Sequence, residues 1–182
     1  QPDTVSAWLS LDDADVEPNR FLAYLILALD QAGVELAHLP HLAASQALDV
    51  QPRRTLNALL QALARENRVI TLFLDDYHLA ASPEVSALLS HLLEHAAPWL
   101  RWVVASRTPP DWPLSRWKAK GWVHEVCAQA LTLSLEEARD ILGADLDATA
   151  LCQIHKATEG WAVAVQLARL WRTSNDLSLI HI

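Results

Sequence analysis

The most constraining feature of this 182-residue chain is an apolar run that ends in two adjacent carboxylates, RVITLFLDDYH, at residues 68–78. Five apolar side chains in the run, Val69, Ile70, Leu72, Phe73 and Leu74, fall on both faces of an extended segment. This pattern predicts a strand buried inside a parallel sheet. Asp75 and Asp76 follow at its carboxyl end, where open α/β sheets bind their ligands. A strand that ends in Asp-Asp is typical of the Walker B motif of P-loop NTPases, although this signal alone is only moderately specific.

The rest of the first 128 residues predicts a doubly wound α/β domain. We expect three further strands at residues 5–11, 100–106 and 122–127. Helical patterns separate them: residues 17–30, residues 52–67, a helix capped by Ser82 and Pro83, and a basic helix at 114–120. Strands that alternate with helical crossovers predict a parallel sheet with flanking helices.

From Leu131 onward the pattern is helical only. Ser134 and Glu137 have capping-box spacing and begin a helix. A second helix begins at Asp147, and a third follows Gly160 and extends to Arg172. We therefore expect a nucleotide-binding domain at residues 1–128, a helical lid at 129–173, and a tail at 174–182. A cloning or sequencing scar would explain the apolar end of this tail.

Composition excludes some functions. The net charge of −8 and the pI of about 5.4 argue against a nucleic-acid surface. No apolar run approaches eighteen residues, so the sequence predicts a cytoplasmic protein without a membrane span. Cys127 and Cys152 lack metal-site spacing and are expected to be small buried hydrophobes. The absence of Met suggests a fragment of a longer protein.

Several segments taken together resemble one family. The runs VSAWLSLDDADVEPNRFLAYLILAL, VITLFLDDYHL, LRWVVASRTPP, TLSLEEARDIL and TEGWAVAVQLARL, in this order, resemble the signal-transduction ATPase module of MalT-type, LuxR-family transcriptional regulators. These are STAND ATPases, relatives of AAA+ proteins. The resemblance covers residues 5–170 and is far more specific than any single motif.

The resemblance implies roles for three residues. Asp75 would hold Mg²⁺ through water, Asp76 would activate the attacking water, and Arg107 would sense the nucleotide phosphate. A simpler interpretation of Arg107 is an ion pair with one of the two aspartates. Trp161, in the Gly-Trp helix start, is expected mainly to pack in a core. The cofactors of the intact protein would be ATP and Mg²⁺, and the switch would be slow hydrolysis at Asp76.

The sequence also departs from the family pattern. The phosphate-binding loop G-x-x-x-x-G-K-[ST] is absent, since none of the four glycines has that spacing to a lysine. We expect a chain that begins after its own loop, with a gap in the sheet between residues 100–106 and 122–127. Such a chain would neither bind ATP tightly nor hydrolyse it. Inducer and promoter DNA would be bound by domains that it lacks, and ATP would drive self-association of the intact protein.

Two alternatives remain open. His91, Glu94 and His95 fit the H-x-x-E-H pattern of inverted zincins, and a third zinc ligand would have to come from elsewhere, with Glu159 as one candidate. In the second, the chain is an interaction module in which Asp75 and Asp76 only cap the next segment. Metal analysis tests the first alternative, and nucleotide binding tests the second.

Overall fold

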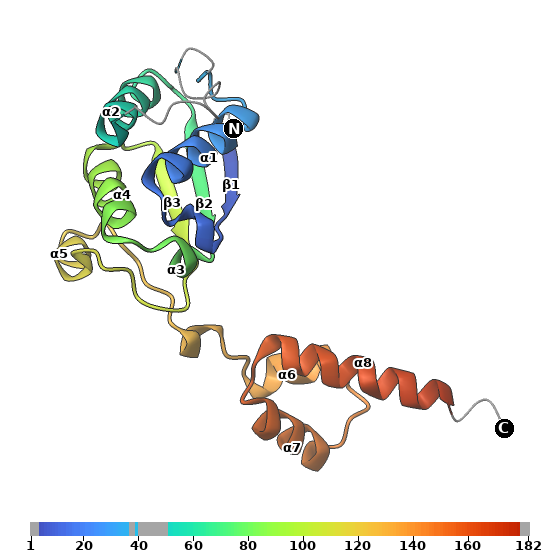
Figure 1. Cartoon of the computed structure of the whole chain (residues 1–182). Coiled ribbons are helices and arrows are strands. Elements are labelled where there is room, and N and C mark those ends of the chain that lie inside the picture. The colour runs from blue at the N-terminus through green and yellow to red at the C-terminus, as the bar shows by residue number, and fades with distance from the viewer. Residues whose placement is uncertain (1–3, 37–38, 40–50, 179–182) are drawn as a thin grey trace. The chain divides into compact units, whose positions relative to one another are not determined.

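The computed structural model describes residues 4–36, 39 and 51–178. The chain divides into two compact units, residues 1–113 and 114–182. Figure 1 labels the helices and strands of both. Each unit is described below by itself.

The first unit is built on a three-stranded parallel sheet. Its strands are β1 (Thr4–Ser10), β2 (Val69–Asp75) and β3 (Leu100–Val104), in the order β1-β2-β3. β2 therefore lies in the centre, with Ser10 opposite Asp75 and Val103 opposite Phe73. The predicted α/β class with a parallel sheet is confirmed, and it is consistent with a P-loop NTPase-like fold.

Helices connect the strands, and the three longest begin within one residue of where the sequence signals predicted. The helices of this unit are the 3₁₀ helix η1 (Asp13–Val16), α1 (Pro18–Gln31), α2 (Pro52–Leu63), the one-turn α3 (Tyr77–Ala80) and α4 (Pro83–His95). Proline occupies the first turn of α1, α2 and α4, where its missing N–H costs no hydrogen bond. The Ser82 hydroxyl accepts a hydrogen bond from the Val85 N–H at 3.2 Å and caps α4.

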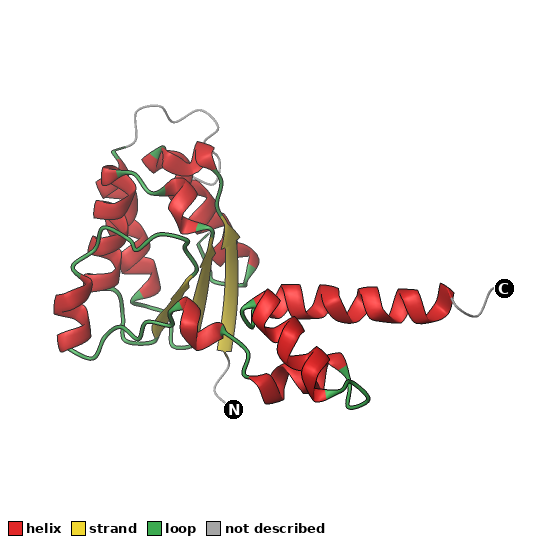
Figure 2. Ribbon diagram, turned by 90° about the horizontal axis from the view of Figure 1, so that it is seen from below, coloured by secondary structure: helices red, strands yellow, loops and turns green. Residues whose placement is uncertain are grey.

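The core lies on one face of the sheet. Alternate residues of β1 and β2 are buried, and Ala7, Ile70 and Leu72 are at most 1% exposed. They pack in one cluster with the apolar residues of α1, α2 and α4, helices that Figures 1 and 2 show beside the strands. Right-handed crossovers that all run in one direction, from β1 to β2 to β3, bring their helices to the same face.

The opposite face of the sheet is much more open. Trp8 and Val103 are 60% and 48% exposed, and Phe73 between them is half-buried. The rings of Trp8 and Phe73 stack with their centroids 5.0 Å apart. The prediction that β2 is buried on both faces is therefore wrong for this face, because the helices of this unit cover only the other one.

The predicted fourth strand at residues 122–127 does not form. This segment belongs to no helix or strand, and Trp122 and Val126 are more than half exposed. A strand needs a hydrogen-bonded neighbour, and in the described part of the chain β3 pairs only with β2.

The second unit is helical. It contains α5 (Leu114–Ala119), the 3₁₀ helix η2 (Ala128–Leu131), α6 (Leu135–Leu142), α7 (Ala148–Thr158) and α8 (Ala162–Ser178). The predicted capping box forms, since Ser134 Oγ accepts from the Glu137 N–H and the Glu137 carboxylate accepts from the Ser134 N–H. A small core of Ala138, Leu142, Leu151 and Val165 joins the last three helices.

Three expectations about this unit are corrected. α8 continues past the predicted end at Arg172, to Ser178, while residues 179–182 lie outside the described part. Trp161 is 64% exposed instead of packed in a core. Cys127 and Cys152 are exposed. Cys127 is the last residue of the unpaired segment 122–127, and Cys152 is next to the buried Leu151, so it lies on another side of α7. Across the described residues, no helix has the length and apolar character needed to cross a membrane.

Candidate functional site: the carboxyl edge of the sheet

Asp75 is the last residue of the central strand. Its carbonyl accepts a hydrogen bond from the Leu11 N–H at 3.1 Å, just beyond the point where Ser10 and Asp75 pair. The backbone of Asp75 is therefore held by the segment that leaves β1. Its side chain is half-buried at the carboxyl edge, the edge at which parallel sheets bind ligands.

Asp76 has an unusual backbone. Its φ of 54° and ψ of 37° place it in the left-handed region, which only two non-glycine residues of the described chain adopt. The Asp76 N–H donates to Asp75 Oδ1 at 3.0 Å, and the Asp76 carbonyl accepts from the Leu79 N–H at 2.9 Å. A left-handed aspartate costs conformational energy, and such residues cluster at active sites and switches. The turn therefore places two adjacent carboxylates at the carboxyl edge of the sheet.

β3 holds this turn from the other side. The Ala105 N–H donates to the Leu74 carbonyl at 2.8 Å, and the Tyr77 N–H donates to the Ala105 carbonyl at 3.0 Å. Arg107 follows two residues later and is exposed. No ion pair joins Arg107 to Asp75 or Asp76 in the described structure, so the simpler interpretation of Arg107 as their partner finds no support.

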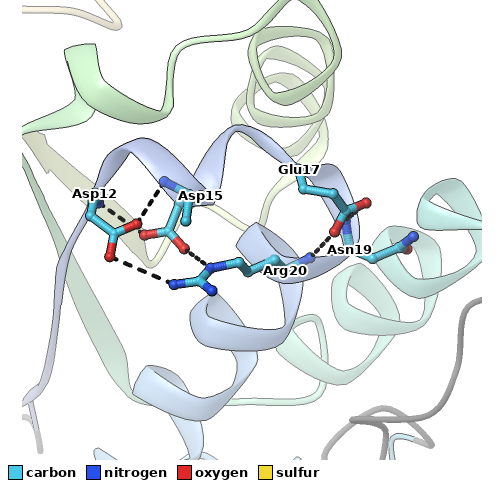
Figure 3. Close-up of polar contacts among 6 residues, drawn as sticks. Asp12, Asp15, Glu17, Asn19 and Arg20 are labelled. Atoms are coloured by element: carbon cyan, nitrogen blue, oxygen red, sulfur yellow. Dashed lines mark hydrogen bonds and ion pairs between the residues drawn. The ribbon is translucent and has the colours of Figure 1, made fainter.

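A second acidic group follows β1 and is organised around Arg20, as Figure 3 shows. Arg20 Nε donates to Asp15 Oδ1 at 2.9 Å, and Arg20 Nη2 lies 3.6 Å from Asp12 Oδ2. Asp15 is only 3% exposed and accepts from the Asp12 N–H. The hydrogen bond from Arg20 to Asp15 raises the pKa of the guanidinium. These carboxylates are already satisfied by a cation and by backbone donors, so their role is structural.

Glu17 has a similar structural role at the start of α1. Its two carboxylate oxygens accept from the Asn19 and Arg20 N–H groups at 3.1 and 2.7 Å (Figure 3). Sequence reasoning missed Arg20 as the centre of this acidic group. The available signal was the spacing of five residues between Asp15 and Arg20, which is weak because it spans the end of one helix and the start of another.

Two more side chains near the aspartates were also missed. Tyr77 is fully buried and shares a hydrogen bond of 2.9 Å with Ser86. Burial is the main cause of the raised pKa of Tyr77. His78 Nδ1 lies 3.8 Å from Asp76 Oδ1. Both residues directly follow Asp76 in the sequence, and nothing local distinguishes them from other polar residues at a strand end.

The H-x-x-E-H pattern places its histidines together. The rings of His91 and His95 stack on α4 with centroids 4.1 Å apart, and His95 Nδ1–H donates to the His91 carbonyl at 2.8 Å. Partial burial and the nearby His95 lower the pKa of His91. No group of three His, Cys, Asp or Glu side chains in the described residues is arranged to hold a metal ion, so the third ligand that zinc needs is not provided there.

Comparison with known proteins identifies relatives of this chain. No model of a known protein family matches the chain. The chain is 32% identical, over 187 aligned residues, to proteins named HTH-type transcriptional regulator MalT from two strains of Klebsiella pneumoniae. The alignment covers 96% of this chain and 20% of each relative. The chain thus spans about one fifth of the length of these relatives.

Proposed function

We propose that this chain is part of an Mg-ATP-dependent switch in a transcriptional regulator. The chain is confirmed to resemble MalT-type transcriptional regulators over nearly its whole length. The observation that carries the proposal is the pair Asp75 and Asp76 at the carboxyl edge of the central strand, with Asp76 left-handed. In P-loop NTPases carboxylates at this position serve the metal and the attacking water.

The surroundings of each residue support the role that we propose for it. Asp75 would bind Mg²⁺ through water: its Oδ1 accepts from the Asp76 N–H, and no described cation pairs with its charge. One carboxylate suits Mg²⁺, which keeps several waters and takes its other ligands from phosphate. The half-exposed carboxylate of Asp76 would orient the attacking water. Arg107 would contact a phosphate oxygen, since a guanidinium with no partner among the described acids is free for an anion.

The open edge of β3 and the open sheet face support a missing phosphate-binding element. A strand beside β3 with a right-handed crossover to β1 would bring its helix onto the face of Trp8, Phe73 and Val103. The amino end of that helix would then lie near Asp75, where helix N–H groups bind phosphate. We propose that this element belongs to the longer polypeptide, because the 182 residues contain no G-x-x-x-x-G-K-[ST] sequence.

We also propose that residues 129–173 form a lid on the nucleotide site.

The test is Mg-ATP binding by the full-length product of the gene, measured by calorimetry with and without Mg²⁺. Asp75→Asn should weaken Mg-dependent ATP binding about tenfold or more, because the metal loses a negative partner. Asp13→Asn is the matched control: it removes one exposed carboxylate near the same edge and should leave binding unchanged. A wild-type protein that binds no ATP would overturn the proposal.

A second candidate function is an interaction module without nucleotide chemistry. The exposed row of Trp8, Phe73 and Val103 favours it, since large exposed apolar patches mark interaction sites. Full-length protein that binds partners equally well with and without Mg-ATP would support this candidate.

The relatives support a proposal about partners and location. They are named as HTH-type transcriptional regulators. We propose that promoter DNA and an inducer are bound by other parts of a cytoplasmic protein, and that ATP favours self-association. With a net charge of −8, these 182 residues are a poor surface for DNA.

A further inference from the structure

His78 lies directly beside the second carboxylate of the proposed site. It is the second residue of α3, and its side chain is 16% exposed, whereas that of Asp76 is 47% exposed. Its Nδ1 is 3.8 Å from Asp76 Oδ1. The imidazole is therefore mostly covered, and its buried nitrogen lies near a carboxylate that is open to solvent.

The Nδ1 atom of His78 is buried and makes no hydrogen bond. Buried polar atoms nearly always have a hydrogen-bond partner, so this one requires a physical explanation. The distance of 3.8 Å is longer than a hydrogen bond, for which N–H···O is typically about 2.7–3.2 Å. Hydrogen bonds at catalytic sites are often long in the free protein and shorten when substrate binds.

The backbone around Asp76 and His78 is fixed by hydrogen bonds, so mainly their side chains can move. Asp76 is held in its left-handed conformation by hydrogen bonds to Asp75 and Leu79. The one-turn helix that carries His78 is anchored by the buried Tyr77, which is bonded to Ala105 and Ser86. A small rotation of the Asp76 side chain is therefore the easiest way to bring the two atoms into hydrogen-bond range.

We propose that His78 is the positioning residue for Asp76: its Nδ1–H donates to one carboxylate oxygen and fixes the other toward the attacking water. This inference rests on the proposed function, since it assigns Asp76 the water-orienting role. The alternative is that the two side chains are neighbours in a turn and the histidine only fills space. A space-filling role would require the ring but not its donor.

The first experiment needs no nucleotide. Long-range ¹H–¹⁵N NMR on the 182-residue protein, at a pH where the rings are neutral, identifies which nitrogen of each histidine carries the proton. We expect His78 to be in the Nδ1–H form and to lose this preference in Asp76→Gly, which removes the carboxylate and suits the left-handed backbone. His95, with Nδ1 on the His91 carbonyl, and His155, with Nε2 on the Leu133 carbonyl, are internal references for the two forms and should not change. An Nε2–H form of His78, or one that Asp76→Gly leaves unaltered, overturns the inference.

The second experiment measures ATP turnover and Mg-ATP affinity of the full-length gene product. His78→Phe should lower kcat between about tenfold and a hundredfold, a loss typical of a misplaced reacting group, with the Kd for Mg-ATP within twofold. His78→Asn should restore most of the rate, since its amide can donate from nearly the same position. Equal turnover in His78→Phe and wild type overturns the positioning role, as does His78→Phe that loses binding and rate together. A wild type that binds no ATP overturns the proposed function instead, and NMR then still decides whether His78 holds Asp76.

Discussion

The Tyr77 hydroxyl lies 2.9 Å from the Ser86 hydroxyl, and both residues are buried. This contact links the residue after Asp76 to α4, on the core side of the sheet. The Tyr77 ring also lies against Trp112, with ring centroids 4.8 Å apart. The turn that carries the two aspartates is therefore anchored in the core of its own unit, although the Asp76 side chain is 47% exposed.

Removing the Tyr77 hydroxyl should destabilise the first unit. Tyr77→Phe leaves the buried Ser86 hydroxyl without this partner, so we expect a loss of about 1–2 kcal/mol in the free energy of unfolding. Ser86→Ala should cost a similar amount, and the double variant less than the sum. Urea unfolding of the wild type, the two single variants and the double variant provides this double-mutant cycle. Additive effects would show that the two hydroxyls do not interact in solution.

The same tyrosine predicts a change of stability at alkaline pH. Burial raises the pKa of Tyr77 above its ordinary value of 10.0. The unfolded chain therefore releases this proton at a lower pH than the folded chain, so stability falls as the pH rises from about 10 toward the raised pKa. Tyr77→Phe should show a smaller loss over this range. Unfolding midpoints at pH 8 and at pH 10.5 test the difference, and parallel curves for the two proteins would contradict it.

Left-handed backbone at a non-glycine residue predicts two stabilising substitutions. Asp76 and Glu159 both have positive φ, 54° and 49°. Replacement by glycine relieves this strain and should raise stability by about 0.5–1 kcal/mol at each position. Hydrogen exchange should show slower opening near α3 for Asp76→Gly and at the end of α7 for Glu159→Gly. Only Asp76→Gly should also abolish ATP turnover in the full-length protein. A loss of stability at Asp76 alone would mean that its carboxylate contributes more to the fold than its backbone costs.

Gly160 should be far less tolerant than Gly121. Both have a φ of 70°, so alanine strains the backbone equally at either position. At Gly160 a Cβ would lie 2.6 Å from the Leu133 carbonyl oxygen and from Thr132 Cγ2, whereas at Gly121 nothing lies within 4 Å. We expect Gly121→Ala to cost about 1 kcal/mol and Gly160→Ala about 2–4 kcal/mol. Thermal unfolding followed by circular dichroism compares them. Equal losses would show that the segment at Leu133 moves aside readily.

Local signals account for the elements that the sequence predicted well. Pro18, Pro52 and Pro83 each lie in the first turn of a helix, and Ser82, Ser134 and Asp147 each cap one. These interactions connect residues two to four positions apart, so they are visible in the sequence. The strand that ends at Asp75 was also predictable, since its apolar run and its acidic end are both local.

Contacts between distant segments decided the rest. The Tyr77 N–H donates to the Ala105 carbonyl, and residues 122–127 remain unpaired although their composition suits a strand. Periodicity could not show that one face of β2 is much more open, because apolar residues at Phe73 and Leu72 look alike until the direction of the crossovers is known.

The order of residues alone therefore determined where the three strands and the longer helices begin and which two carboxylates end the central strand, because those features depend on neighbours along the chain. Only the folded chain decided which nitrogen, hydroxyl or guanidinium lies beside each carboxylate. Such pairings depend on which strand edges and helix faces meet. A polar group that burial removes from water then costs free energy unless it has a hydrogen-bond partner.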